Sequence, residues 1–190
     1  AIWFRGVITA GLGLLIVSVA SAQYSGGTGE PNDPYQIATA ADLIALGEEP
    51  NDYDKHFILT ADIDFSDYPA DQYNCISSFS GVFDGNGHTI SNFTSIGEGH
   101  DAALFSYVRD PNAVIKNLGL VDPNVQATTG GAGGLVGDLW EGCVQDCYVS
   151  GGRILGNYNV GGLVGYSRST GKIIGCYSTA VVSGGSVVGG

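Results

Sequence analysis

Basic residues are scarce in this sequence. Seven lysines and arginines stand against nineteen aspartates and glutamates, which leaves a formal net charge of -12 at pH 7. A surface with this excess of negative charge repels the phosphate backbone of DNA or RNA. The charge balance therefore excludes nucleic acid as an expected partner.

The common hydrolase motifs are also missing. A zinc protease of the His-Glu-x-x-His type needs two histidines four residues apart, whereas His56, His88 and His100 are much more widely separated. No Gly-x-Ser-x-Gly segment of a serine hydrolase occurs either. We therefore expect no catalytic site, no cofactor and no resident metal in this chain, and no enzymatic activity of its own.

A long membrane-spanning run is absent. Residues 6–19 follow Arg5 and carry no charge, but a helix that crosses a bilayer needs roughly 20 apolar residues. The run ends in small residues at 20–22, which is typical of a secretory signal peptide. We expect residues 1–22 to be this signal and the mature chain to have no membrane span; an uncleaved anchor is the alternative.

Glycine, in contrast, is abundant. The chain has 31 glycines in 190 residues, where ordinary proteins have about 7%. The glycines do not recur at every third position and prolines number only 6, which excludes collagen. Hydrophobic residues make up 44% of the chain, too much for a disordered acidic segment. The composition favours a folded, repetitive and turn-rich protein.

The strongest signal is an internal repeat. Residues 133–137 read Gly-Gly-Leu-Val-Gly, the same five residues return at 161–165, and a third copy opens at 189–190 with equal spacing. Cys147 and Cys176, each followed by tyrosine, keep nearly the same spacing. Weaker copies precede these at residues 90–93, 103–107 and 115–119. We expect the chain to be a piece of a longer protein in which this repeat continues.

The repeat is built of strands. Each unit contains apolar stretches of four to six residues separated by Gly, Asn, Ser and Asp, and it lacks the ten-residue stretches of helical periodicity that helical repeats need. Stacked units place parallel strands about 4.8 Å apart, with apolar side chains of successive rungs in contact. We therefore predict an all-β fold, a parallel β-helix (β-solenoid), right-handed like most parallel crossovers.

A short N-terminal cap precedes the solenoid in this prediction. Residues 34–37 form a strand, and Thr39 caps a helix together with Asp42. The helix has an apolar face and a glycine at its expected end: Leu43, Ile44, Leu46 and Gly47. An end cap protects the open core and edge of a solenoid. The predicted domains are residues 1–22 (signal peptide), 23–58 (strand and capping helix) and 59–190 (solenoid).

These segments together resemble bacterial surface proteins built from the GLUG motif. The Gly-Leu-Val-Gly cores stand at residues 134–137 and 162–165, and the lead-in matches at residues 33–37, 59–64 and 79–90. Such proteins are large, exported and adhesin-like, and some relatives attach the repeats to immunoglobulin-A-cleaving zinc peptidases. The resemblance implies a secreted or cell-surface setting and identifies no ligand.

The densest acidic cluster is the main candidate for a metal or catalytic site. It consists of Asp62, Asp64, Asp67 and Asp71. Carboxylate oxygens of this kind can hold Ca²⁺, and paired carboxylates are the machinery of glycosidases. Asp62 and Asp64 alternate with apolar residues, however, as on a strand with one face in solvent. We expect solvated carboxylates here, with a structural Ca²⁺ and catalysis as alternatives.

Three further features have a structural and a functional interpretation. Residues 84–87 (Asp-Gly-Asn-Gly) are predicted to form a tight turn rather than a calcium loop. Cysteines allow three pairings after export; we expect Cys147 and Cys176 to form a buried ladder of thiols, with a disulfide as the alternative. Tyrosines are expected to fill the core or corners, with sugar stacking on an outer face as the alternative. The residues concerned are Cys75, Cys143, Cys147 and Cys176, and Tyr107, Tyr148, Tyr166 and Tyr177.

The sequence thus predicts a noncatalytic exported repeat domain, either an adhesin-like binding surface or a structural spacer on the bacterial surface. The expected partner class is an extracellular glycan or protein. Two alternatives remain open. One is a polysaccharide lyase or glycosidase-like enzyme, since β-helices often carry such activities; the other is the accessory region of a secreted zinc peptidase.

Overall fold

The computed structural model describes residues 23–69, 74–97, 102–168 and 170–189. They form a parallel β-solenoid of about four turns with a single short α-helix among them. This confirms the predicted fold class. The expected signal peptide at residues 1–22 lies outside the described residues, so it stays a prediction.

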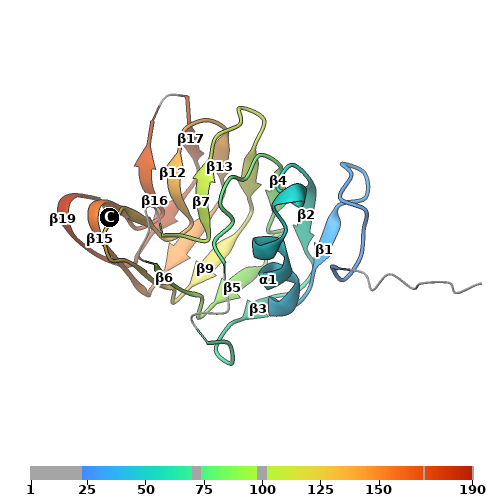
Figure 1. Cartoon of the computed structure of the whole chain (residues 1–190), viewed down its shortest axis with the longest axis horizontal. Coiled ribbons are helices and arrows are strands. Elements are labelled where there is room, and N and C mark those ends of the chain that lie inside the picture. Colours follow the sequence, from blue (N-terminus) through green and yellow to red (C-terminus); the bar gives the residue numbers. More distant parts are fainter. Residues whose placement is uncertain (1–22, 70–73, 98–101, 169, 190) are drawn as a thin grey trace, which may run out of the picture.

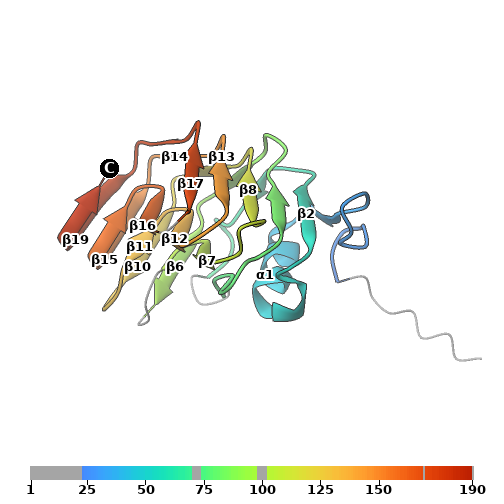
Figure 2. The same cartoon turned by 90° about the horizontal axis from the view of Figure 1, so that it is seen from above.

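Four parallel sheets run along the coil, and on each of the central rungs the chain passes through all four of them in turn (Figures 1 and 2). The first sheet has the order β1 (Tyr35–Ile37), β2 (His56–Leu59), β4 (Val82–Asp84), β8 (Val114–Lys116), β13 (Cys143–Gln145) and β17 (Lys172–Ile174). The second contains β3 (Ile63–Asp64), β5 (Thr89–Ser91), β9 (Gly119–Val121), β14 (Tyr148–Ser150) and β18 (Tyr177–Ser178).

The third and fourth sheets complete the central rungs. The third contains β6 (Thr94–Gly97), β10 (Asn124–Ala127), β11 (Ala132–Gly133), β15 (Arg153–Gly161) and β19 (Val181–Gly189). The fourth has the order β7 (Phe105–Val108), β12 (Val136–Leu139) and β16 (Val164–Ser167).

The strand register reproduces the period of the sequence repeat. Val144 of β13 pairs with Ile173 of β17, and Val136 of β12 pairs with Val164 of β16. The weaker upstream copies also align, since Phe105 pairs with Val136. Successive units therefore stack in register, as the spacing of the motifs predicted.

Buried side chains form columns inside the coil. In the first sheet, Phe57, Phe83, Ile115 and Val144 occupy successive rungs of one column and are buried. Aromatic rings fill the N-terminal half, where Phe83 and Phe105 meet edge to face with ring centroids 5.4 Å apart. Such columns bury apolar area continuously along the axis, which is the main stabilising term in a repeat fold.

The repeated glycines make the tight turn between the third and fourth sheets. A Cβ at Gly133 would collide with the carbonyl oxygen of Val136, and a Cβ at Gly161 would collide with that of Val164. Only glycine allows the chain to fold back this closely. The Gly-Gly-Leu-Val-Gly core therefore recurs because each rung contains the same turn.

The N-terminal cap has the predicted capping box. Helix α1 (Ala40–Glu48) begins after Thr39, whose side chain accepts a hydrogen bond from the Asp42 amide, while the Asp42 carboxylate accepts one from the Thr39 amide at 2.9 Å. The helix passes through Gly47 and ends at Glu48, so the predicted stop at Gly47 was wrong. Gly47 is required for close approach, because a Cβ there would collide with the Asn74 carbonyl oxygen.

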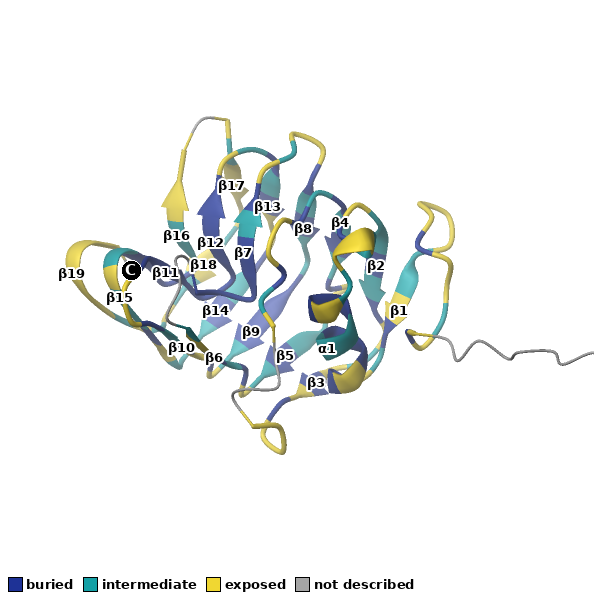
Figure 3. Ribbon diagram, in the orientation of Figure 1, coloured by how far each residue is buried: buried dark blue, intermediate teal, exposed yellow. Residues whose placement is uncertain are grey.

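The last rung of the described chain is uncovered. Ile173 and Val181 of this rung are 45% and 68% exposed, and Figure 3 shows exposed residues along β16 and β19. A hollow of about 410 Å³ lies at this end, against the glycine turn at 161–165.

None of the helices in the described part of the chain has the length and apolar character needed to span a membrane. A 3₁₀ turn, η1 (Pro50–Asp52), follows α1 at the opposite end.

Candidate functional site

The predicted acidic cluster connects two rungs. Asp62 accepts a hydrogen bond from the backbone N–H of Thr89 at 2.8 Å and lies 3.2 Å from His88 Nδ1. Asp64 accepts one from the Asn92 side chain at 2.8 Å. These hydrogen bonds, above all those from Thr89 and Asn92, lower the pKa of each carboxyl group below its usual value.

The other two members of the cluster add little to a site. Asp67 is exposed, and Asp71 lies outside the described residues. Across the described ranges, no group of three or more His, Cys, Asp or Glu side chains is arranged to hold a metal ion. Asp62 and Asp64 are exposed, as expected from the alternation in the sequence, and their hydrogen bonds tie neighbouring rungs together. The alternatives of a structural Ca²⁺ and of catalysis stay untested.

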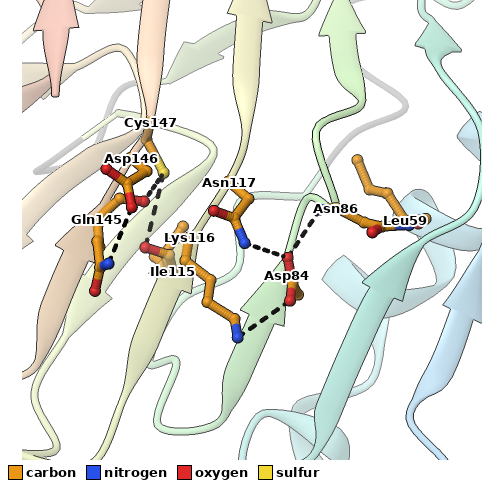
Figure 4. Close-up of polar contacts among 9 residues, drawn as sticks. All are labelled: Leu59, Asp84, Asn86, Ile115, Lys116, Asn117, Gln145, Asp146 and Cys147. Atoms are coloured by element: carbon orange, nitrogen blue, oxygen red, sulfur yellow. Dashed lines mark hydrogen bonds and ion pairs between the residues drawn. The ribbon is translucent and has the colours of Figure 1, made fainter. Parts of the chain in front are cut away.

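Asp84 makes a similar connection one rung further along the coil (Figure 4). Its carboxylate accepts a hydrogen bond from Asn117 Nδ2 at 3.0 Å and from the Asn86 amide at 2.8 Å, and it lies 3.1 Å from Lys116 Nζ. Burial acts to raise the pKa of Asp84, but these donors outweigh it and the net shift is downward. Asn86 and Gly87 have φ values of 52° and 80°, so residues 84–87 form the predicted tight turn.

The cysteine ladder occupies the position predicted from the spacing of its two members. All four cysteines are free thiols, and the backbone N–H of Cys147 donates to Cys176 Sγ at 3.3 Å from the adjacent rung. Cys147 is buried and its Sγ donates to the Gln145 carbonyl at 3.2 Å (Figure 4). Burial raises the pKa of Cys147 to about 12, which describes an inert packing thiol.

The fourth sheet carries an outward array of side chains that the sequence did not reveal. Tyr107, Asp138 and Tyr166 stand in register on β7, β12 and β16. Arg109, Trp140 and Arg168 follow two residues later, each one position beyond the end of its strand. Because side chains alternate along a strand and the intervening Val108 and Leu139 are fully buried, both rows face outward.

Five of these residues form a continuous stack along the solenoid axis, in the order Tyr107, Arg109, Trp140, Arg168 and Tyr166; we call it the arginine–aromatic stack. The Arg109 guanidinium lies 4.2 Å from the Tyr107 ring centroid and 5.0 Å from that of Trp140. The Arg168 guanidinium lies 4.1 Å from the Trp140 centroid and 4.8 Å from that of Tyr166. Each cation–aromatic contact of this kind contributes about 0.5–1 kcal/mol at an exposed site.

A buried carboxylate holds the centre of the stack. Asp138 is only 2% exposed; it accepts a hydrogen bond from Trp140 Nε1 at 2.7 Å and one from Arg168 Nε at 3.2 Å. A second guanidinium nitrogen, Nη2, also contacts the carboxylate. Such a two-pronged pair fixes the guanidinium plane as well as its position. Asp138 therefore aligns Arg168 and Trp140 before any ligand arrives.

The stack borders a hollow of about 380 Å³. The hollow is also lined by Tyr158 and Asn159 of β15, which reach it from the neighbouring sheet. Its size is at the lower end of the roughly 300–1,000 Å³ that small-molecule sites occupy. The wall consists of phenol, amide, carboxylate and guanidinium groups, so it suits a small polar ligand.

The preferred interpretation of the recurring tyrosines was wrong. Tyr107 and Tyr148 are half-buried, while Tyr166 and Tyr177 are 39% and 57% exposed. Tyr148 and Tyr177 stack on each other with ring centroids 5.3 Å apart, on the outside of the second sheet. The inward positions are taken by aliphatic residues such as Val149. The tyrosines are outward by strand alternation.

Comparison with known proteins supports the fold. No family model matches the chain, so membership of the GLUG proteins stays a prediction. Halomucin of Haloquadratum walsbyi is 33% identical over 152 residues, which cover 73% of this chain but only 2% of halomucin. The crystal structure of a "putative immunoglobulin A1 protease" from Bacteroides ovatus matches with a TM-score of 0.70 and 24% identity, over 86% of this chain and 53% of that chain. At this identity the structural likeness extends to the fold alone.

Proposed function

We propose that this chain is a noncatalytic exported repeat domain that acts as a binding surface at the cell surface. The observation that carries the proposal is the arginine–aromatic stack beside its 380 Å³ hollow. Aromatic and arginine side chains dominate the energetics of binding surfaces, and here a buried carboxylate fixes them in advance. Preorganised side chains lose little entropy when a partner binds.

The state of the acidic residues supports a noncatalytic role. A glycosidase needs one carboxyl group whose pKa is raised, so that it can act as a general acid. The pKa values of Asp62, Asp64 and Asp84 are instead lowered by hydrogen bonds to neighbouring rungs. Their charged forms are thus engaged in holding the coil together.

A location at the cell surface fits the N-terminal sequence and the repeat architecture. Residues 1–22 have the charge, apolar run and small residues of a signal peptide. The segment of halomucin that matches this chain is 2% of that protein, which fits a repeat unit within a very long chain. In such a chain each rung adds about 4.8 Å of length, so a spacer is the natural second role of the same fold.

The test is to apply the chain to arrays of extracellular glycans and proteins, next to the variant Trp140→Ala. We expect binding to at least one class of component and a loss of at least tenfold in the variant. If nothing on either array binds, the binding role is wrong and only the spacer role is left. In a parallel assay, acidic polysaccharides incubated with the chain and Ca²⁺ should release no unsaturated or reducing products.

A further inference from the structure

The two arginines that lie over the Trp140 ring determine which class of ligand the arginine–aromatic stack can bind. Strands β7 and β16 flank β12 on opposite sides, so Arg109 and Arg168 approach the indole from opposite sides at 5.0 and 4.1 Å. A neutral sugar that stacks on an aromatic face would have to displace a guanidinium group. The stack therefore presents guanidinium N–H edges and phenol groups to a ligand, and these favour an anion.

The two arginines differ in how far they are already neutralised. Arg168 is paired with the buried carboxylate of Asp138. Arg109 is exposed and, within the part of the chain that the structure describes, its guanidinium takes part in no ion pair. Among the described residues no carboxylate thus neutralises Arg109, and the rings of Tyr107 and Trp140 hold it in place.

The rest of the hollow is polar and carries groups that match hydroxyls. Tyr158 and Asn159 line it from the rung that also contains β16, whereas Arg109 follows β7 two rungs earlier. Two rung spacings are about 10 Å. A fitting ligand has an anionic group at one end and hydroxyl or amide groups along the rest of its length.

From this arrangement we infer that the hollow binds an acidic sugar residue, whose carboxylate or sulfate group is received by Arg109. This inference rests on the proposed binding function and names its ligand class. The planar guanidinium donates two parallel hydrogen bonds to either anion. The chain as a whole has a net charge of -12. Two of its four arginines nevertheless line this hollow, so the attraction for an anion is confined to this part of the surface.

Three probes with one common core test the inference by calorimetric titration of the full chain: lactose, 3′-sialyllactose and 3′-sulfolactose. At least one acidic probe should bind tenfold or more tightly than lactose, and the comparison of the two shows whether carboxylate or sulfate is preferred. Hexaglutamate serves as an acidic peptide control and should bind more weakly than the better acidic sugar.

Matched variants locate the binding. Arg109→Gln should weaken the acidic probe by at least tenfold and Arg109→Lys by less, because lysine keeps the charge but loses the planar fork. Arg153→Gln removes the same charge from an exposed position on β15 and should change the affinity by less than twofold. Urea unfolding of each variant checks that the fold is intact.

The possible failures are distinguishable. Three results would overturn the assignment to an acidic sugar and leave the general binding role intact. They are equal affinity for lactose and both acidic probes, equal losses of affinity in Arg109→Gln and Arg153→Gln, and tighter binding of hexaglutamate than of the acidic sugars. If none of the probes and no array component binds, the proposed function fails as well.

Discussion

Individual residues at the corners of the rungs determine whether the chain can turn. The corner between the first and second sheets holds Asn117, Asp146 and Gly175 on successive rungs, with φ values of 53°, 51° and 66°. Asparagine, aspartate and glycine tolerate this left-handed conformation better than other residues do. The recurring Asn, Asp and Gly that separate the apolar stretches are therefore required by the backbone.

Substitution at Asn117 separates its two contributions. Asn117→Ala should lower the free energy of unfolding by about 2 kcal/mol, because alanine is strained at positive φ and cannot donate to Asp84. Asn117→Gly should lower it by about 1 kcal/mol, because glycine adopts the conformation freely but also loses the hydrogen bond. Urea denaturation of both variants measures the difference; equal losses would contradict a role for the backbone.

Cys147 should be chemically protected. Its pKa is raised to about 12 by burial, so at pH 8 the group is almost entirely the unreactive thiol. Under reducing conditions at this pH, iodoacetamide should alkylate Cys147 at least ten times more slowly than the half-buried Cys143, as measured by mass spectrometry of peptides. In urea the two should react at similar rates; equally fast labelling of the native chain would show that Cys147 is not buried.

At the scale of single elements, each strand is stabilised by the column to which it contributes. Ile115 of β8 lies between Phe83 and Val144 and is fully buried. Ile96 of β6 has the same side chain but is 53% exposed. The two isoleucines provide a matched test of the columns.

Ile115→Ala should lower the free energy of unfolding by about 2–4 kcal/mol, because it removes buried methyl groups and leaves a cavity between two rungs. Ile96→Ala should change it by about 0.5 kcal/mol or less. Urea denaturation again provides the measurement. Similar losses at the two positions would mean that the columns do not stabilise the coil.

The elements also show how far sequence reasoning could reach. The glycine turns and apolar stretches recur at nearly constant spacing, so rungs, register and the capping box at Thr39 were predictable. The arginine–aromatic stack was not, because Arg109, Trp140 and Arg168 come from three rungs and differ in residue type. A signal was nevertheless present: they stand five residues after Leu104, Leu135 and Leu163, one leucine in each copy of the repeat.

At the scale of the whole molecule, in-register stacking places side chains from different repeat units next to one another on the outer faces of the coil. One set of outward side chains, Asp62, Asp64 and Asp84, holds neighbouring rungs together, and the fourth sheet presents the arginine–aromatic stack. The first set gives a structural role to three of the acidic residues of the N-terminal rungs. The second gives an acidic protein one local surface suited to an anion.

Both sets of side chains depend on in-register stacking of the repeat units. The most direct test is a methyl NOESY spectrum of the chain with assigned isoleucine and valine methyl groups. We predict cross-peaks between Ile115 and Val144 and between Val144 and Ile173, which pair on adjacent strands, and none between Ile115 and Ile173, two rungs or about 10 Å apart. Absence of the two predicted cross-peaks, or contacts of Val144 that are shifted by one residue along either neighbour, would contradict the account.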